Sequence, residues 1–186
     1  MDKNILEKKS RKMSQLLRHD PKPLVMDDKG WVNSHELCKY LDITMEGLEW
    51  IVENNDKKRF AFNDDKTLIR ANQGHSKGIA DDKDYAKITA LQVELELYHG
   101  TDNVTAELIK NDKILAGNRQ FVHWSASMET ATKRARQRAF HNKTNPVIVV
   151  LRARSYIHNK GKLLMADNAV YLTPEIDGNI LEYRPI

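Results

Sequence analysis

The chain has 186 residues, 40% of them hydrophobic and 30% charged, which supports packed cores and excludes a chain that is disordered throughout. Its 30 basic and 26 acidic residues give a formal charge of +4, which favours an anionic partner without a strongly basic tail. The single cysteine, Cys38, excludes an internal disulfide and a cysteine-based zinc site, and we interpret it as a core thiol. With no long apolar run and a polar start to the chain, we expect a cytoplasmic monomer that does not enter membranes.

Three helices are predicted at the start of the chain. Apolar residues at helical spacing predict a helix over residues 5–17, and the prolines that follow end it. Arg18 and His19 therefore close this helix. Asn33 and Thr44 each match the N-cap of a further helix, because each precedes a stretch of apolar residues at helical spacing.

A β-hairpin follows the helices. Residues 59–62 and 67–70 read as strands, and the polar residues 63–66 between them read as a turn. Three helices and a hairpin predict a winged-helix-like lobe over residues 1–80. Residues 81–92 are rich in Asp and Lys and lack periodicity, so we expect a linker there.

Residues 93–186 alternate short apolar stretches with helical ones. Helices are expected near residues 105–110 and 128–140, with the basic residues of the second mostly on its outer face: Lys133, Arg134, Arg136 and Arg138. Strands are expected at 95–99, 121–124, 147–151, 163–165, 170–172 and 180–183. The strand-rich end predicts an α+β lobe with a mixed sheet rather than a doubly wound one.

Several standard sites are excluded by their motifs. The sequence contains no glycine-rich phosphate loop, no dinucleotide fingerprint, no zinc-protease helix and no nucleophile elbow. The seven histidines include no pair four residues apart, so we expect no metal.

Cations and hydrogen-bond donors remain as candidates. Arg18 and His19 at a helix end either bind an anion or complement the helix dipole, and Arg59 either grips a phosphate or belongs to a solvated basic run. Gly74-His75-Ser76 either helps to seat a phosphate or ends the hairpin. In His99-Gly100-Thr101, glycine would let a ligand approach a strand end while its neighbours offer donors.

Taken together, these residues resemble the RNA 2′-phosphotransferase family, NAD-dependent enzymes that remove a 2′-phosphate left at a tRNA splice junction. The resemblance spans nearly the whole chain and rests on ordered blocks: Leu16-Leu17-Arg18-His19, Asp28-Lys29-Gly30-Trp31, Lys57-Lys58-Arg59-Phe60, Ile69-Arg70-Ala71-Asn72-Gln73-Gly74-His75-Ser76, Tyr98-His99-Gly100-Thr101, Arg119-Gln120-Phe121-Val122-His123-Trp124-Ser125 and Asn168-Ala169-Val170-Tyr171-Leu172-Thr173. The sequence departs from the family at Trp124, where a leucine is usual, and at Ala169, where a glycine is usual.

The resemblance implies a winged-helix-like RNA lobe ahead of an ADP-ribosyltransferase-like lobe that holds NAD. It implies four catalytic residues: Arg18, His19, Arg59 and Arg119. The residues implied to bind NAD are His99, Gly100, Thr101, His123, Ser125 and Val170, among which His99, His123 and Val170 form the family's triad. Those implied to seat the RNA phosphate are Gln73, Gly74, His75 and Ser76.

The implied reaction has two steps. The 2′-phosphate of a tRNA-like RNA attacks C1″ of the nicotinamide ribose and expels nicotinamide; the ribose 2″-hydroxyl then attacks the phosphorus. The products are RNA with a 2′-hydroxyl and ADP-ribose 1″,2″-cyclic phosphate. Such chemistry asks chiefly for alignment and charge stabilisation, which arginines supply. Arg18, Arg59 and His19 would hold the phosphate, and Arg119 would reach toward the NAD phosphates.

Two other functions stay open from the sequence. The chain could ADP-ribosylate a phosphorylated nucleic-acid end without completing the second step. Alternatively, it could be a winged-helix protein that binds nucleic acid and has no enzymatic activity. This alternative gives no role to the sequence blocks around His99 and Arg119.

Overall fold

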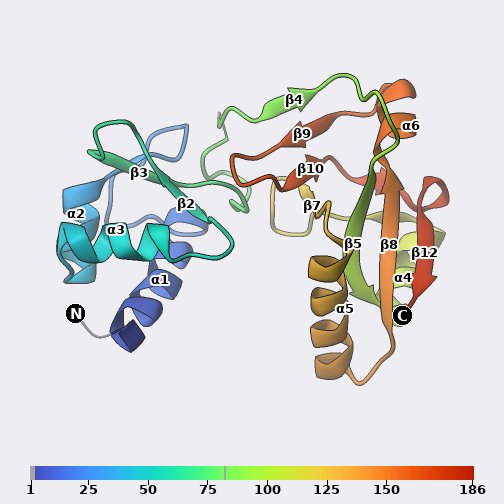
Figure 1. Cartoon of the computed structure of the whole chain (residues 1–186), viewed down its shortest axis with the longest axis horizontal. Coiled ribbons are helices and arrows are strands. Elements are labelled where there is room, and N and C mark those ends of the chain that lie inside the picture. The colour runs from blue at the N-terminus through green and yellow to red at the C-terminus, as the bar shows by residue number, and fades with distance from the viewer. Residues whose placement is uncertain (1–2, 82) are drawn as a thin grey trace. The chain divides into compact units, whose positions relative to one another are not determined.

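The computed structural model describes residues 3–81 and 83–186 (Figure 1). The chain divides into two compact units, which we describe one at a time. The first holds residues up to Asp84 together with Asn118–Gln120, and the second holds Tyr85–Gly117 and Phe121–Ile186. The division at a linker over residues 81–92 stays a prediction, although residues 86–88 of that range form a strand.

The first unit combines three helices with a small antiparallel sheet. Its helices are α1 (Lys3–Arg18), α2 (Ser34–Leu41) and α3 (Met45–Glu53), and its strands are β1 (Val32–Asn33), β2 (Phe60–Phe62) and β3 (Leu68–Ala71). The sheet has the order β1-β3-β2, and apolar residues of all three helices share one core with β1, β2 and β3. The predicted helices and hairpin are therefore confirmed; the name winged helix stays a prediction.

Local sequence signals set the ends of these helices. The side chain of Asn33 accepts hydrogen bonds from the N–H groups of His35 and Glu36, and Thr44 accepts one from Gly47. Both satisfy N–H groups that a helix leaves without a partner at its start, as the sequence predicted. Cys38 is buried in the core, which confirms its interpretation as a core thiol.

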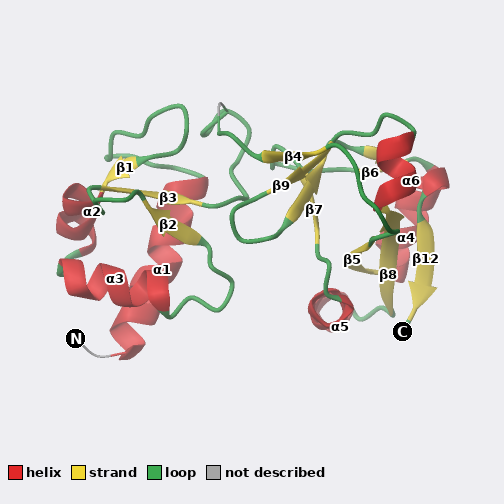
Figure 2. Cartoon of the chain, turned by 45° about the horizontal axis from the view of Figure 1, so that its top comes forward, coloured by secondary structure: helices red, strands yellow, loops and turns green. Residues whose placement is uncertain are grey.

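The second unit contains further helices and small sheets (Figure 2). Its helices are α4 (Asn103–Asn111), α5 (Met128–Asn142), α6 (Ala153–His158) and the 3-10 helix η1 (Gly178–Ile180). Its strands are β4 (Ala86–Ile88), β5 (Glu96–Asp102), β6 (Lys113–Ile114), β7 (Val122–Trp124), β8 (Pro146–Arg152), β9 (Leu163–Met165), β10 (Tyr171–Thr173), β11 (Ile176–Asp177) and β12 (Glu182–Pro185).

Short strands make small sheets in this unit. The sheets have the orders β4-β9-β10-β7, β12-β8-β5 and β11-β6, and the named strands pair antiparallel. The α+β class is thus confirmed, whereas the described residues form several small antiparallel sheets instead of one mixed sheet. The ADP-ribosyltransferase-like name for this lobe stays a prediction.

Helix α5 packs closely on the sheet at Gly100. A Cβ atom built on Gly100 would lie 2.0 Å from the carbonyl oxygen of Ala131 and 2.7 Å from the backbone nitrogen of Ala135, both in α5. Only a residue without a side chain lets the helix backbone come so near, and the alanines on this face of the helix keep the packing flat. The glycine therefore serves helix packing, independently of any ligand.

The start of α4 is tied to α5 by a buried carboxylate. Asp102 is 1% exposed; it accepts a hydrogen bond from the N–H of Thr105 and one of 2.7 Å from Nε of Arg138. Asn142 donates to the same carboxylate, and these partners outweigh burial to hold the pKa of Asp102 down to about 2. The expectation that the basic residues of α5 lie mostly on its outer face is confirmed for Lys133, Arg134 and Arg136, whereas the guanidinium of Arg138 pairs with this carboxylate.

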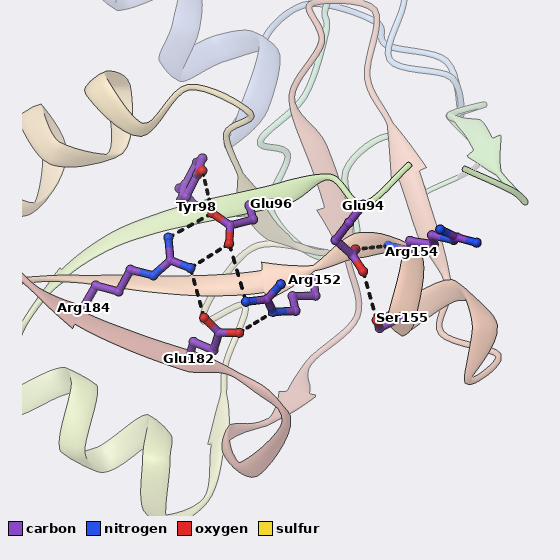
Figure 3. Close-up of polar contacts among 8 residues, drawn as sticks. All are labelled: Glu94, Glu96, Tyr98, Arg152, Arg154, Ser155, Glu182 and Arg184. Carbon is purple, nitrogen blue, oxygen red and sulfur yellow. Dashed lines mark hydrogen bonds and ion pairs between the residues drawn. The ribbon is translucent and has the colours of Figure 1, made fainter. Parts of the chain in front are cut away.

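A second charged network crosses the three-stranded sheet (Figure 3). Arg184 donates two hydrogen bonds to Glu96, at 2.9 and 2.6 Å, and one to Glu182; Arg152 also donates to Glu182. Tyr98 donates its hydroxyl to Glu96. Two carboxylates and two guanidinium groups balance in charge, so this network joins β5, β8 and β12 and is not a site for a further anion.

The elements that the sequence did not predict are mostly short. Strands of two or three residues, such as β1, β4, β6 and β11, show no readable alternation. The last strand begins at Glu182 because the preceding Gly178–Ile180 forms a 3-10 turn. Among the helices of the described residues, none is long and apolar enough to cross a membrane.

Candidate active site

The end of α1 is fastened by one serine. The N–H of Ser76 donates to the carbonyl of Arg18 at 2.8 Å, and Oγ of Ser76 lies 2.9 Å from Nδ1 of His19. Arg18, at the last position of the helix, also places its charge beside the carbonyl groups that end it. Two of the four predicted catalytic residues are therefore held by one residue from the loop after β3.

The same loop holds Arg119. Ser76 and Arg119 form an antiparallel bridge, and the backbone of Gln120 donates to the carbonyl of His75 at 3.3 Å. The side-chain amide of Gln120 donates to the carbonyl of Ile79 and to Asp81. Segment 118–120 thus runs alongside the loop, joined to it by this isolated bridge, and it belongs with the first unit although it is distant in sequence.

Gly74 lets the loop lie against Arg18. It has φ of +89°, and a Cβ atom built on it would lie 3.6 Å from Cζ of Arg18. Glycine adopts this left-handed conformation at little cost, whereas other residues do not. Gln73, which precedes it, is half-buried, and its assignment to the RNA phosphate stays a prediction.

Arg59 is positioned by two buried asparagines. Oδ1 of Asn55 accepts from the backbone N–H of Arg59 at 3.1 Å and from its guanidinium group at 3.4 Å. Asn72 donates its side-chain amide to Lys58 and its backbone N–H to the carbonyl of Arg59. Both asparagines are buried. Sequence reasoning did not single them out, although Asn72 lies within a block that carried the resemblance.

Arg18 and Arg59 line the same cavity. Its volume is about 520 Å³, and its walls come from α1, the end of α3 and the residues that follow α3. The fold of the first unit thus brings both arginines to one polar space, beside His19 and the segment of Arg119. All four predicted catalytic residues lie in this unit.

The electrostatics of this region are strongly positive. The pKa of His19 is lowered by desolvation and by the charges of Arg18 and Arg119. The pKa of His75, which is 1% exposed, is lowered to about 3 by burial and then by Lys83, Arg18, Arg70 and His19. Both histidines are therefore neutral at pH 7, and several cations face one small volume, an arrangement that suits a phosphate dianion.

His75 is a buried support of the loop. Its ring packs near Gly30, where a Cβ atom would lie 3.4 Å from Nε2. Such burial fits a role beneath the loop better than direct contact with RNA, so His75 as a phosphate ligand stays a prediction.

The second unit contains all six residues assigned to NAD. Tyr98 and Ser125 exchange backbone hydrogen bonds of 2.8 and 2.9 Å, which join β5 to the end of β7. Nδ1 of His99 lies 3.0 Å from the carbonyl oxygen of His123, and its ring meets Trp124 edge to face. The hydroxyl of Ser125 accepts from the N–H of Ser127 just before α5.

Thr101, two residues after His99 on β5, has a buried hydroxyl group. The residue is 1% exposed, and its hydroxyl has no hydrogen-bond partner among residues 3–81 and 83–186. A buried hydroxyl is rarely left so, and a polar ligand or water would satisfy it. Val170 precedes β10, whose first residue Tyr171 pairs with Trp124, so the chain carries Val170 to the end of β7.

Comparison with known proteins identifies the family of the chain. Residues 5–175 match the profile of the RNA 2′-phosphotransferase, Tpt1 / KptA family. The chain belongs to this family. It is 36% identical to a probable RNA 2′-phosphotransferase of Flavobacterium johnsoniae, over 99% of this chain and 100% of that one. The probable RNA 2′-phosphotransferase of Fusobacterium nucleatum is 34% identical over 98% and 100%, and that of Pseudomonas aeruginosa PAO1 is 36% identical over 95% and 96%.

Trp124, where this chain departs from the leucine usual in the family, is accommodated by a hydrogen bond to a threonine. Its Nε1 donates to Oγ1 of Thr173 at 2.9 Å, and both residues are buried. The polar atom of the indole is thereby satisfied, as a buried tryptophan requires.

Ala169, the second departure, has a left-handed backbone with φ of +59°. The N–H of Ala166 donates to the carbonyl of Val170, and that of Ala169 donates to Ala166, which closes a three-residue loop between β9 and β10. The third residue of such loops is commonly left-handed and commonly glycine. The usual glycine of the family thus has a conformational reason at this position.

Proposed function

We propose that this protein is an NAD-dependent enzyme that transfers an internal 2′-phosphate of RNA to NAD. Its products are RNA with a 2′-hydroxyl, nicotinamide and ADP-ribose 1″,2″-cyclic phosphate. Membership of the family supports the transfer of a 2′-phosphate from RNA. The observation that carries the proposal is the set of contacts of Ser76, which fasten Arg18, His19 and Arg119 in one place.

Arg18 and Arg59 would hold the phosphate. A guanidinium group keeps its charge at neutral pH and grips two phosphate oxygens at once, and these two arginines share a cavity. In the first step a phosphate oxygen bonds to C1″ as the bond from C1″ to nicotinamide breaks. The nucleophile is already an anion, so this step needs alignment and not a base.

His19 would move the proton of the second step. Its Nδ1 is engaged by Ser76, which leaves Nε2 for the substrate, and its lowered pKa keeps the ring neutral and able to accept a proton. The 2″-hydroxyl gives its proton to Nε2 as its oxygen attacks the phosphorus. The bond from phosphorus to the RNA 2′-oxygen breaks, and that oxygen takes the proton.

The second unit would hold NAD. NAD supplies the ribose that receives the phosphate. The buried hydroxyl of Thr101 fits a polar ligand, and His99, whose Nδ1 contacts the carbonyl of His123, lies two residues before it on β5. Gly100, Ser125 and Val170 shape the backbone around them. Arg119 would stabilise charge on the phosphates and in the second transition state.

The direct test is to incubate the protein with NAD and a short RNA that carries one internal 2′-phosphate, and to resolve the products. We expect cyclic phosphate and nicotinamide in equal amounts, only when NAD is present. A stable ADP-ribosylated RNA would instead indicate transfer without the second step, and binding that NAD does not alter would indicate a nucleic-acid binder.

Variants assign the roles. Arg18→Ala or Arg59→Ala should cost about 2 to 4 kcal/mol of transition-state stabilisation, because each removes a charge-assisted contact to the phosphate. Arg154→Ala is the matched control, since this exposed arginine lies in α6 of the second unit. Wild-type turnover by either of the first two variants would overturn the assignment.

A further inference from the structure

The cavity that holds Arg18 and Arg59 extends well past them along α1. Ser10, Arg11 and Ser14 line it together with Arg18. Their spacing of three or four residues places them on one face of the helix. With a rise of about 1.5 Å per residue, the backbones of Arg11 and Arg18 are about 10 Å apart along the axis. A ligand that contacts both is therefore longer than one phosphate group.

The wall of the cavity opposite α1 contributes an aromatic ring and side-chain amides. Trp50 and Asn54 line it from the end of α3, and Trp50 is half-buried, so part of its surface remains open. Aromatic rings bind unpaired bases by stacking, whereas hydroxyls, amides and guanidinium groups bind the sugar-phosphate backbone. The groove between α1 and α3 offers both kinds of contact.

The size and charge of the groove restrict the kinds of ligand that it can bind. A volume of about 520 Å³ lies within the range of about 300 to 1,000 Å³ that small-ligand sites occupy, so the groove takes a short segment and not a duplex. Three arginines of the lining exceed its two acids, Glu7 and Asp56, by one charge. A modest excess suits one or two phosphodiesters of a single strand.

We propose that this groove between α1 and α3 binds the single-stranded RNA that adjoins the 2′-phosphorylated nucleotide, with Arg11 on a backbone phosphate and Trp50 against a base. The proposal rests on the proposed function, because it takes the 2′-phosphate to lie at Arg18 and Arg59. The enzyme would then recognise unpaired nucleotides next to the 2′-phosphate of its substrate.

The test measures binding of RNA without NAD, so that no turnover occurs. A labelled single-stranded hexanucleotide and a dinucleotide, each with one internal 2′-phosphate, are titrated against the full chain. Arg11→Ala should weaken the hexanucleotide about fivefold more than the dinucleotide, as loss of one phosphate contact predicts. The slope of log affinity against log salt should also fall by about 0.7 for the hexanucleotide.

Two further variants separate contact from folding. Lys8→Ala removes the same charge from an exposed position of α1 outside the cavity lining, and both RNAs should bind it as they bind the wild type. Trp50→Phe keeps a ring for stacking and should retain most of the preference for the longer RNA, whereas Trp50→Leu should lose it. Thermal melting of each variant checks the fold.

The outcomes decide the groove and the function separately. Equal binding of both RNAs by Arg11→Ala and wild type would overturn the groove proposal, as would a loss of affinity with an unchanged salt slope. Either result leaves NAD-dependent dephosphorylation standing. If the wild type fails to dephosphorylate both RNAs with NAD, the proposed function fails, while the binding comparison still decides what the groove holds.

Discussion

Oγ of Ser76 lies 2.9 Å from Nδ1 of His19, so in the proposed reaction Nε2 is the imidazole nitrogen left for the substrate. The backbone of Ser76 also bonds Arg18 and pairs with Arg119. Because these backbone contacts do not involve the hydroxyl, the side chain can be removed without releasing either arginine. Ser76 is therefore a positioning residue whose effect on His19 can be measured alone.

Ser76→Ala should lower kcat by roughly two- to tenfold, since one hydrogen bond of this kind contributes about 0.5 to 1.5 kcal/mol. The rate should fall because the imidazole ring of His19 no longer keeps a single orientation. Single-turnover kinetics with 2′-phosphorylated RNA and NAD give the rate, and NMR of the imidazole nitrogens reports the tautomer. Ser76→Thr should restore both.

Ser34→Ala is the control for this prediction. The hydroxyl of Ser34 is buried in the same unit and has no hydrogen-bond partner among the described residues. Its removal deletes the same atom without a lost contact, so activity should stay at the wild-type level. Equal losses in both variants would mean that the hydroxyl of Ser76 has no particular effect on His19.

Gly74 and Gly78 measure the cost of a left-handed backbone with and without Arg18 as a neighbour. They have φ of +89° and +82°, and a Cβ atom would lie 3.6 Å from Cζ of Arg18 at Gly74 and near nothing within 4 Å at Gly78. Alanine at either position should reduce the free energy of unfolding by about 1 to 2 kcal/mol, because it takes up a left-handed backbone. A Cβ atom at Gly74 makes only ordinary van der Waals contact with Arg18, so neither alanine should displace the guanidinium or lower kcat in the folded enzyme. Urea unfolding and turnover assays measure the two effects, and a loss of turnover in Gly74→Ala alone would contradict this.

The sequence predicted what depends on neighbours in the chain. Helices α1 and α2 and the caps at Asn33 and Thr44 follow from spacing and from polar residues at fixed offsets. Arg18 and His19 could be located at the end of α1 for the same reason.

Contacts between segments that are distant in the chain could not be predicted from the sequence. The bond from Asn72 to Lys58 and the bridge from Ser76 to Arg119 depend on how β3 and its loop fold back. The sequence predicted Gly100 as a glycine that lets a ligand approach, and only the position of α5 shows that it serves helix packing. Periodicity carries no information about which helix backbone will cover a strand.

Acid should destabilise the fold through His75. Its folded pKa of about 3 lies below its ordinary value of 6.5, so only the unfolded state takes up a proton between these values. Stability is therefore fully present above pH 6.5 and falls as the pH drops toward 3, with a loss of about 2 kcal/mol at pH 5. His75→Gln should remove most of that loss, measured as the difference in free energy of unfolding between pH 7 and pH 5.

Other titrating groups change the stability over different pH ranges, or their effect can be measured with a control variant. Glu96 and Asp102, each with a pKa of about 2, cost stability below their ordinary values of 4.5 and 3.8. His19 shares the direction of His75, so a smaller slope should persist in His75→Gln. His35→Gln makes the same substitution at an exposed histidine of α2 and serves as the matched variant. An undiminished slope in His75→Gln would show that the buried imidazole is not its source.

Ala169→Gly should stabilise the protein, although glycine usually weakens a fold. The left-handed backbone of Ala169 costs about 1 to 2 kcal/mol. Glycine removes that cost but adds about 0.4 to 1 kcal/mol of chain entropy to the unfolded state. The net gain in free energy of unfolding should be about 0.5 to 1 kcal/mol, seen as a higher urea midpoint with an unchanged slope. Ala126→Gly, at an exposed alanine without a left-handed backbone, should lower the midpoint. If both substitutions lower it, the hairpin loop holds Ala169 without strain, and the preference of the family for glycine there has another cause.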